Sequence, residues 1–162
     1  MKTRALVIFL ILIIAGCRSK RHLTEESPFR RGLGPITWGA SFALIDSLTA
    51  MDTLWKKVST IENSQTGGHI WVIKESQREY YLEFDTKDRL YMISYIADTV
   101  DLDTMKKQLT KFYGEPEQNS KRVNSYRELS WNVEADSVHL AIQILITRKQ
   151  YALKVENKKN FN

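Results

Sequence analysis

The stretch VHLAIQILIT, from Val138 to Thr147, holds the longest strand pattern in the sequence. Every second residue from Val138 to Ile146 is apolar and branched, whereas the residues between them include His139 and Gln143. Successive side chains of a β-strand point to opposite faces of a sheet, so a period of two predicts a strand with one face in the core. We therefore expect a long strand here and a sheet built around it.

Amphipathic strands are expected on both sides of this stretch. Residues 129–133 alternate between apolar and polar before it, and residues 151–155 do so after the short Arg148-Lys149 connection. Neither this connection nor the one at 134–137 has room for a crossover helix. The three strands are therefore predicted to be antiparallel.

An earlier group of strands is expected between residues 58 and 97. Residues 69–74 carry apolar side chains on both faces, which predicts a central strand covered on both sides. Residues 80–85 alternate as a half-buried strand, and the turn at 86–89 returns the chain as its partner, 90–97. A short strand is expected at 58–61.

A helix is predicted ahead of each group of strands. In the first, Ser41 offers a side-chain oxygen to the free amides of a helix start. The expected core-facing stripe, at helical spacing, is Leu44, Leu48, Met51 and Trp55.

The second helix is marked more clearly. Asp101 and Asp103 lie at its start, where the helix dipole favours carboxylates. Its expected buried stripe is Leu102, Met105, Leu109 and Phe112. Tyr113-Gly114-Glu115-Pro116 should end it, because glycine accepts a left-handed cap and proline cannot continue a helix.

The order of helix, strands, helix, strands predicts an α+β fold: an antiparallel sheet with two helices packed on one face. Ordered structure should begin near Ile36, so that residues 36–156 form a single domain and 157–162 a polar tail. Residues 117–127 are expected to be a polar loop. Because each half is a helix followed by a meander, the chain has the pattern of a degenerate duplication.

The N-terminus has the pattern of an export signal. Lys2 and Arg4 precede an apolar run at 5–14, which is shorter than the roughly 20 residues that a membrane span requires. The run ends in Ile14-Ala15-Gly16-Cys17, which resembles the lipobox of bacterial lipoproteins. That resemblance implies removal of residues 1–16 as a signal peptide and acylation of Cys17, which would anchor the mature chain in the lipid bilayer. An ordinary signal peptide cut elsewhere, with Cys17 incidental, is the alternative.

The positive charge is concentrated ahead of the folded body. The chain has a formal charge of +5, but Lys2 and Arg4 belong to the signal and residues 17–31 hold five basic and two acidic residues, which leaves 32–162 neutral. Residues 17–35 are therefore expected to form a basic tether. Anionic lipid headgroups would attract such a tether, and a solvated spacer that happens to be basic is the alternative. A neutral, exported body argues against nucleic-acid binding. By resemblance to Gram-negative lipoproteins, Arg18 after Cys17 implies the outer membrane, facing the periplasm.

No cofactor, metal site or catalytic residue set is expected. Cys17 is the only cysteine, so acylation leaves no free thiol for catalysis or metal binding. His22 lies in the tether, and His69 and His139 lie on separate predicted strands without metal-ligand spacing. A cell-envelope hydrolase, which would have to use His69 or His139, is the least favoured of the functions considered.

Three carboxylates, Glu83, Asp85 and Asp88, lie close together on the predicted hairpin. Carboxylate oxygens bind Ca²⁺, but these lie beside Lys87 and Arg89 and lack the regular spacing of a calcium loop. A solvated hairpin end is the favoured interpretation.

A binding surface remains as the candidate functional site. Trp71, Tyr81, Tyr91 and Tyr95 occupy strand positions that could face away from the helices, and rigid aromatic rings suit protein or peptide contacts. The alternative is a core closed over by loops or by dimerisation.

Two further motifs, ITWGASFALID (Ile36 to Asp46) and LTKFYGEP (Leu109 to Pro116), resemble those of small exported bacterial α+β lipoproteins. The architecture is similar to outer-membrane assembly accessory lipoproteins and to the β-lactamase-inhibitor-protein fold. The resemblance implies a non-catalytic lipoprotein that binds a protein partner or acts as a scaffold in the cell envelope, and it carries over no site residues. An inhibitor or immunity protein that neutralises an enzyme or toxin is the alternative.

Overall fold

The computed structural model describes residues 26–51, 55–62, 68–75, 78–119, 127–135 and 138–158. The predicted export signal, Cys17, Arg18 and His22 lie outside the described residues, as do 120–126 of the expected polar loop and 159–162 of the expected tail. Within the described part, most of the chain forms one antiparallel sheet.

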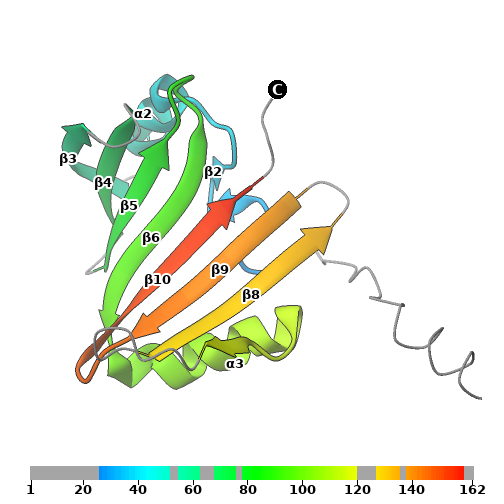
Figure 1. Ribbon diagram of the computed structural model, residues 1–162. Coiled ribbons are helices and arrows are strands. Elements are labelled where there is room, and N and C mark those ends of the chain that lie inside the picture. Colours follow the sequence, from blue (N-terminus) through cyan, green and yellow to red (C-terminus); the bar gives the residue numbers. More distant parts are fainter. Residues whose placement is uncertain are drawn as a thin grey trace, which may run out of the picture.

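The sheet has eight strands in the order β3-β4-β5-β6-β10-β9-β8-β7, as Figure 1 shows for its larger strands. The strands are β3 (Trp55–Glu62), β4 (His69–Glu75), β5 (Arg78–Phe84), β6 (Leu90–Asp98), β7 (Glu117–Asn119), β8 (Arg127–Ala135), β9 (Val138–Ile146) and β10 (Gln150–Asn157). The helix α2 (Phe42–Met51) precedes the first four strands; the 3₁₀ turn η1 (Thr99–Asp101) and the helix α3 (Leu102–Tyr113) precede the last four. The prediction of an α+β fold with an antiparallel sheet and two helices is confirmed.

The two groups of strands meet through the last strand of each, because β6 pairs with β10. A row of directly paired residues crosses six strands, and all of its members are buried: Trp71, Leu82, Ile93, Val155, Ile142 and Trp131. We call the side of the sheet that carries this row the inner face, and the opposite side the outer face. The alternation in β9 is confirmed, since Val138, Leu140, Ile142 and Ile144 are all buried on the inner face.

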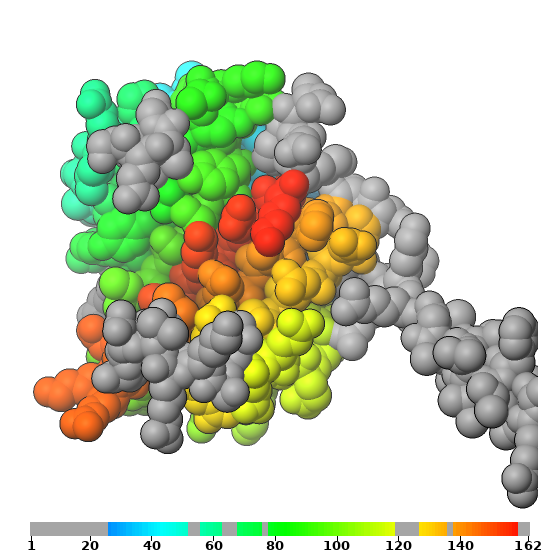
Figure 2. Space-filling model, viewed as in Figure 1, coloured from blue at the N-terminus to red at the C-terminus, as the bar shows by residue number. Residues whose placement is uncertain are grey.

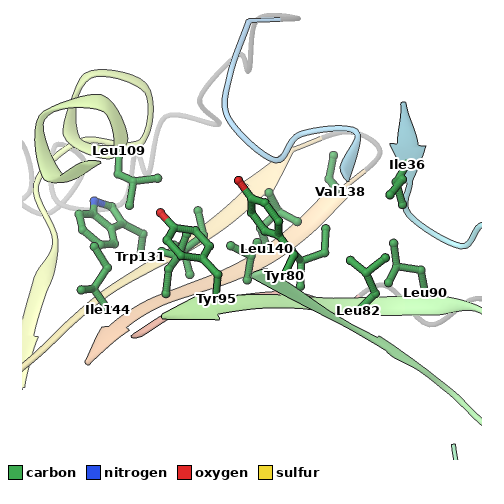
Figure 3. Close-up of a cluster of buried hydrophobic side chains, with 14 of the residues drawn as sticks. Ile36, Tyr80, Leu82, Leu90, Tyr95, Leu109, Trp131, Val138, Leu140 and Ile144 are labelled. Atoms are coloured by element: carbon green, nitrogen blue, oxygen red, sulfur yellow. The ribbon is translucent and has the colours of Figure 1, made fainter. Parts of the chain in front are cut away.

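The helix α3 forms where it was predicted and packs on the core. Leu109 and Tyr113 are buried, and Leu102, Met105 and Phe112 pack against the core with partial exposure. Gly114 follows the helix with a φ of 78°, and its N–H donates to the carbonyl oxygen of Thr110 at 2.8 Å. Figure 3 shows Leu109 beside Trp131 and Ile144, which links this helix to the inner face.

The helix α2 packs through other residues than those predicted. The capping prediction is confirmed, because the backbone N–H of Leu44 donates to the side-chain oxygen of Ser41 at 3.3 Å. The predicted stripe is wrong: Leu44 is 49% exposed, Met51 is 85% exposed, and the helix ends before Trp55, which begins β3.

The side chains that hold α2 to the sheet are Phe42 and Ile45, one helical turn apart. Ile45 is fully buried, and the ring of Phe42 lies 4.0 Å from that of Trp71 and 5.9 Å from that of Phe84, measured between ring centroids. Two large aromatic partners on the inner face fix the helix at Phe42, and this rotates Leu44 toward solvent.

The described structure begins at Glu26, before the expected start at Ile36. Residues 32–37 form a small hairpin of β1 (Gly32–Leu33) and β2 (Ile36–Thr37), in which Ile36 is buried. Gly32 has a φ of 130°, and a Cβ added there would lie 2.0 Å from the carbonyl oxygen of Ile36. Gly32 therefore allows a tight turn within the range that was predicted to be a tether.

Hydrogen bonds join this N-terminal segment to the rest of the domain. The hydroxyl of Tyr113 donates to the carbonyl oxygen of Pro28, and the indole N–H of Trp38 donates to that of Phe29 at 2.7 Å. The backbone N–H of Gly39 donates to the carbonyl oxygen of Leu90 at the start of β6. Part of the predicted tether is thus part of the fold.

Three strand predictions change in detail. The strand predicted at 58–61 is longer and forms the edge of the sheet as β3. The strand β4 lies next to this edge and is not central, although Trp71, Val72 and Ile73 are buried on its two faces as expected. At the other edge, the first residues of the predicted polar loop form β7, which pairs with β8.

Candidate binding surface

The four aromatic residues predicted to form a binding surface lie on different faces of the sheet. Trp71 and Tyr95 are 0% and 1% exposed and point into the core, so their assignment to an exposed surface is wrong. Tyr81 and Tyr91 are half-buried. Tyr81 pairs with Val72 of β4 and Ser94 of β6, which places it on the outer face.

The separation of Tyr91 from Tyr95 is due to a register shift. A spacing of four would put both on the same face of a regular strand. The pairing of β5 with β6 changes between Glu83 and Phe84, since Glu83 lies opposite Met92 and Phe84 opposite Leu90. Tyr91 is the additional residue, and its side chain lies with Glu83 on the outer face.

Polar and charged side chains surround the two tyrosines on the outer face. Ser94 pairs with Lys154 of β10, which in turn pairs with Gln143 of β9, and all three are half-buried. The Nζ of Lys154 lies 3.9 Å from the Oε2 of Glu156. In Figure 2 the strands β6, β10, β9 and β8 lie side by side across the molecule. We call Tyr81, Tyr91, Glu83, Lys154 and Glu156 the tyrosine patch.

Tyr91 is held as a neutral hydrogen-bond donor. Its hydroxyl donates to the Oε2 of Glu83 at 3.1 Å. Burial raises the pKa of Tyr91 to about 12, and the negative charges of Glu83, Glu156 and Asp85 act in the same direction. The phenol therefore remains protonated at neutral pH, and the pair can offer a hydroxyl and a carboxylate to a partner.

A second feature is a hollow of about 200 Å³ at the turn between β5 and β6. It is lined by Phe42, His69, Asp85, Thr86 and Asp88. Burial opposes ionisation of Asp85, but hydrogen bonds from Arg89 and from the backbone N–H of Lys87 outweigh it and hold the pKa of this carboxyl below its ordinary value.

The carboxylates of the hairpin therefore have separate roles. Asp85 accepts hydrogen bonds from the guanidinium of Arg89 at 3.0 and 2.8 Å, whereas Glu83 lies on the outer face with Tyr91. The interpretation as a solvated hairpin end therefore needs a change at Asp85, whose partly buried carboxylate holds the turn together through Arg89. Within the described ranges, no three His, Cys, Asp or Glu residues come together as a metal-binding group.

The structure does not bring the two described histidines together. His69 is in β4, 6.1 Å from the ring of Phe42, and His139 is in β9, where its Nε2 lies 3.7 Å from Glu134. The strands β5, β6 and β10 lie between them. In the part of the chain that can be described, no helix has the length and apolar character needed to span a bilayer.

A polar cluster on the inner face was missed by the sequence analysis. The guanidinium of Arg78 lies 5.0 Å from the ring centroid of Tyr95 and 3.5 Å from Asp101, and the hydroxyls of Tyr95 and Tyr151 are 3.4 Å apart. Burial raises the pKa of Tyr95, and its hydrogen bond with Tyr151 acts in the same direction. Figure 3 shows the hydroxyls of Tyr80 and Tyr95 pointing away from the sheet. This cluster joins residues that are far apart in the sequence. Their proximity follows from the register of the paired strands, which the sequence pattern does not give.

Comparison with known proteins gives no match: no family model fits the chain, and neither a curated protein nor a solved structure is significantly similar to it.

Proposed function

We propose that this chain is a lipoprotein of the bacterial envelope, anchored by an acylated Cys17 in the outer membrane and facing the periplasm. The support is the signal pattern at 1–17, in which a basic start, a short apolar run and Ile14-Ala15-Gly16-Cys17 occur in that order. Its folded body is a non-catalytic module that binds a protein partner.

The observation that carries the binding proposal is the tyrosine patch on the outer face. Tyr81 and Tyr91 supply aromatic area that loses little conformational entropy on contact, and Glu83, Lys154 and Glu156 supply charges of both signs beside them. A partner with an aromatic or aliphatic centre and mixed charges around it would fit this pattern.

The same proposal includes a degenerate duplication with both helices on one face. Its support is that each half is a helix followed by four strands, and that the halves meet through β6 and β10. Phe42 of α2 contacts Trp71, and the carbonyl oxygen of Gly114 after α3 accepts the indole N–H of Trp131 at 2.7 Å. Trp71 and Trp131 are both members of the buried inner row.

The anchor is tested by the intact mass of the protein extracted from its native membrane. We expect a chain that begins at Cys17 and carries the added mass of a diacylglyceryl group and an amide-linked acyl chain. An unmodified thiol, or a soluble product cut at another position, would contradict the anchor.

The binding surface is tested by crosslinked affinity purification from the same membranes. We expect one stoichiometric partner, whose affinity falls by about 30-fold for each of Tyr81→Ala and Tyr91→Ala if each tyrosine contributes about 2 kcal/mol. Val100→Ala, at an 89% exposed position in η1, is the control and should leave the affinity unchanged. Equal affinity of all three variants would exclude the tyrosine patch as the contact.

A further inference from the structure

The exposed side of α2 has an unusual composition for a surface helix. Its outward residues are Ala43, Leu44, Ser47, Ala50 and Met51, which lie together around the helix axis and carry no charge. Leu44 and Met51 are 49% and 85% exposed. Most surface helices carry charged residues on this side, so α2 exposes apolar area that the fold itself does not use.

The polar groups on this side are already satisfied or lie at its rim. The hydroxyl of Ser47 donates to the carbonyl oxygen of Ala43 at 3.0 Å, so it needs no external partner. The single charge of the helix, Asp46, lies 3.8 Å from the Nζ of Lys57 on β3. Transfer of this helix face into an apolar medium would therefore leave few polar groups without a partner.

We propose that α2 docks on the surface of the lipid bilayer, with Leu44 and Met51 inserted at the boundary between headgroups and acyl chains. This inference rests on the proposed acylation of Cys17. Glu26, where the described structure begins, is nine residues after Cys17. Nine residues span at most about 30 Å even when fully extended, which keeps the domain within about one diameter of the bilayer.

The size and charge of the patch favour a bilayer over a protein partner. A helix of ten residues is about 15 Å long and about 10 Å wide, well below the roughly 800 Å² per partner of a stable protein interface. A bilayer needs no such area, because the anchor already supplies a high local concentration. The charge of Asp46 at the rim of the patch is offset by Lys57 on the neighbouring strand β3, so no net negative charge opposes the approach of this helix face to anionic headgroups.

Fluorescence quenching by brominated lipid tests the proposal in the acylated, full-length mature protein. The vesicles contain phosphatidylethanolamine and phosphatidylglycerol, with or without bromine on the acyl chains. Leu44→Trp adds a reporter on α2, and Ile96→Trp adds one at a 55% exposed position on β6. We expect the added fluorescence of Leu44→Trp to be lost in brominated vesicles and that of Ile96→Trp to be retained.

A second pair of variants tests whether apolar insertion causes the quenching. In the Leu44→Trp background, Met51→Asp should restore the fluorescence, whereas Val100→Asp, at an equally exposed position, should not. Neither position is buried, so both variants should keep the unfolding midpoint of the parent.

The outcomes separate this inference from the anchor. Protein that floats with the vesicles but shows no quenching at Leu44→Trp, or equal quenching at both reporters, overturns docking by α2 and leaves the anchor intact. If quenching occurs only when a second protein is reconstituted in the vesicles, α2 binds that protein, and docking of α2 on the bilayer itself is also overturned. If protein extracted from its native membrane carries an unmodified Cys17 and does not float with the vesicles, the anchor is refuted and this inference with it.

Discussion

Two buried tryptophans differ in what their indole N–H groups contact. The N–H of Trp131 donates to the carbonyl oxygen of Gly114 at 2.7 Å, at the point where α3 ends. The N–H of Trp71 is fully buried, and among the described residues it has no hydrogen-bond partner. A buried donor without a partner costs about 1–3 kcal/mol, so Trp71 holds a penalty that Trp131 does not.

We therefore expect Trp131→Phe to lower the free energy of unfolding by about 1–3 kcal/mol more than Trp71→Phe. The first variant loses a hydrogen bond and leaves a carbonyl unpaired, whereas the second removes an unpaired donor. Both variants lose similar volume and keep an aromatic ring at the position, so the expected difference comes mainly from the indole N–H groups. Urea unfolding measures it, and an equal or larger loss in Trp71→Phe would contradict this account.

For single residues, the sequence predicted the strand that holds a side chain better than the face on which the side chain lies. His69 and His139 were predicted on separate strands, and the structure places them in β4 and β9. The placement of Tyr91 and Tyr95 on opposite faces was not visible, because it depends on one additional residue in β6 opposite β5. A register shift depends on how two strands pair, so the sequence pattern of either strand alone does not reveal it.

The two helices show when the spacing of apolar residues predicts which side of a helix is buried. In α3, charged residues occupy the solvent side and the apolar positions fall on one side, so the predicted and observed stripes agree at Leu102, Met105, Leu109 and Phe112. In α2, FALIDSLTAM has one charge in ten residues, and apolar residues surround the axis. Several stripes fit such a sequence, and the contacts of Phe42 with Trp71 and Phe84 select one of them.

The corrected packing of α2 predicts opposite outcomes at adjacent positions. Ile45→Ala should lower the free energy of unfolding by about 2–4 kcal/mol, because it removes a fully buried side chain and leaves a cavity. Leu44→Ala should change it by less than about 0.5 kcal/mol, since Leu44 is half exposed and alanine favours helix. Thermal or urea unfolding of the two variants decides between the predicted stripe and the observed one.

For the whole molecule, the order of strands is the feature that sequence patterns could not supply. Alternation identified both meanders, since their strands are joined by short turns. The pairing of β6 with β10 joins residues about fifty positions apart, such as Tyr95 and Leu153, and no local signal specifies it. The part that residues 26–35 play in the fold was missed for a similar reason, because Pro28 contacts Tyr113, which is far away in the sequence.

This order predicts that the C-terminal strand is essential to the whole sheet. A chain that ends at Lys149 lacks β10, so β6 and β9 lose a partner along their full length and the buried row is cut in two. We expect this chain to lose cooperative unfolding, and a synthetic peptide of residues 148–158 to restore the native circular dichroism spectrum. A chain that ends at Lys158 keeps every strand that the structure describes and is the control. Native-like unfolding of the shorter chain without the peptide would refute the prediction.

The central place of β10 in the sheet also affects when the domain can fold during synthesis. The strand that completes the middle of the sheet is the last of the described strands in chain order, so the earlier meander must wait with β6 unpaired on one side until β10 has been made. During that delay the nascent chain is open to chaperones and to any translocation machinery, both of which act on unfolded protein. Completion of the sheet therefore waits for the synthesis of residues 150–157.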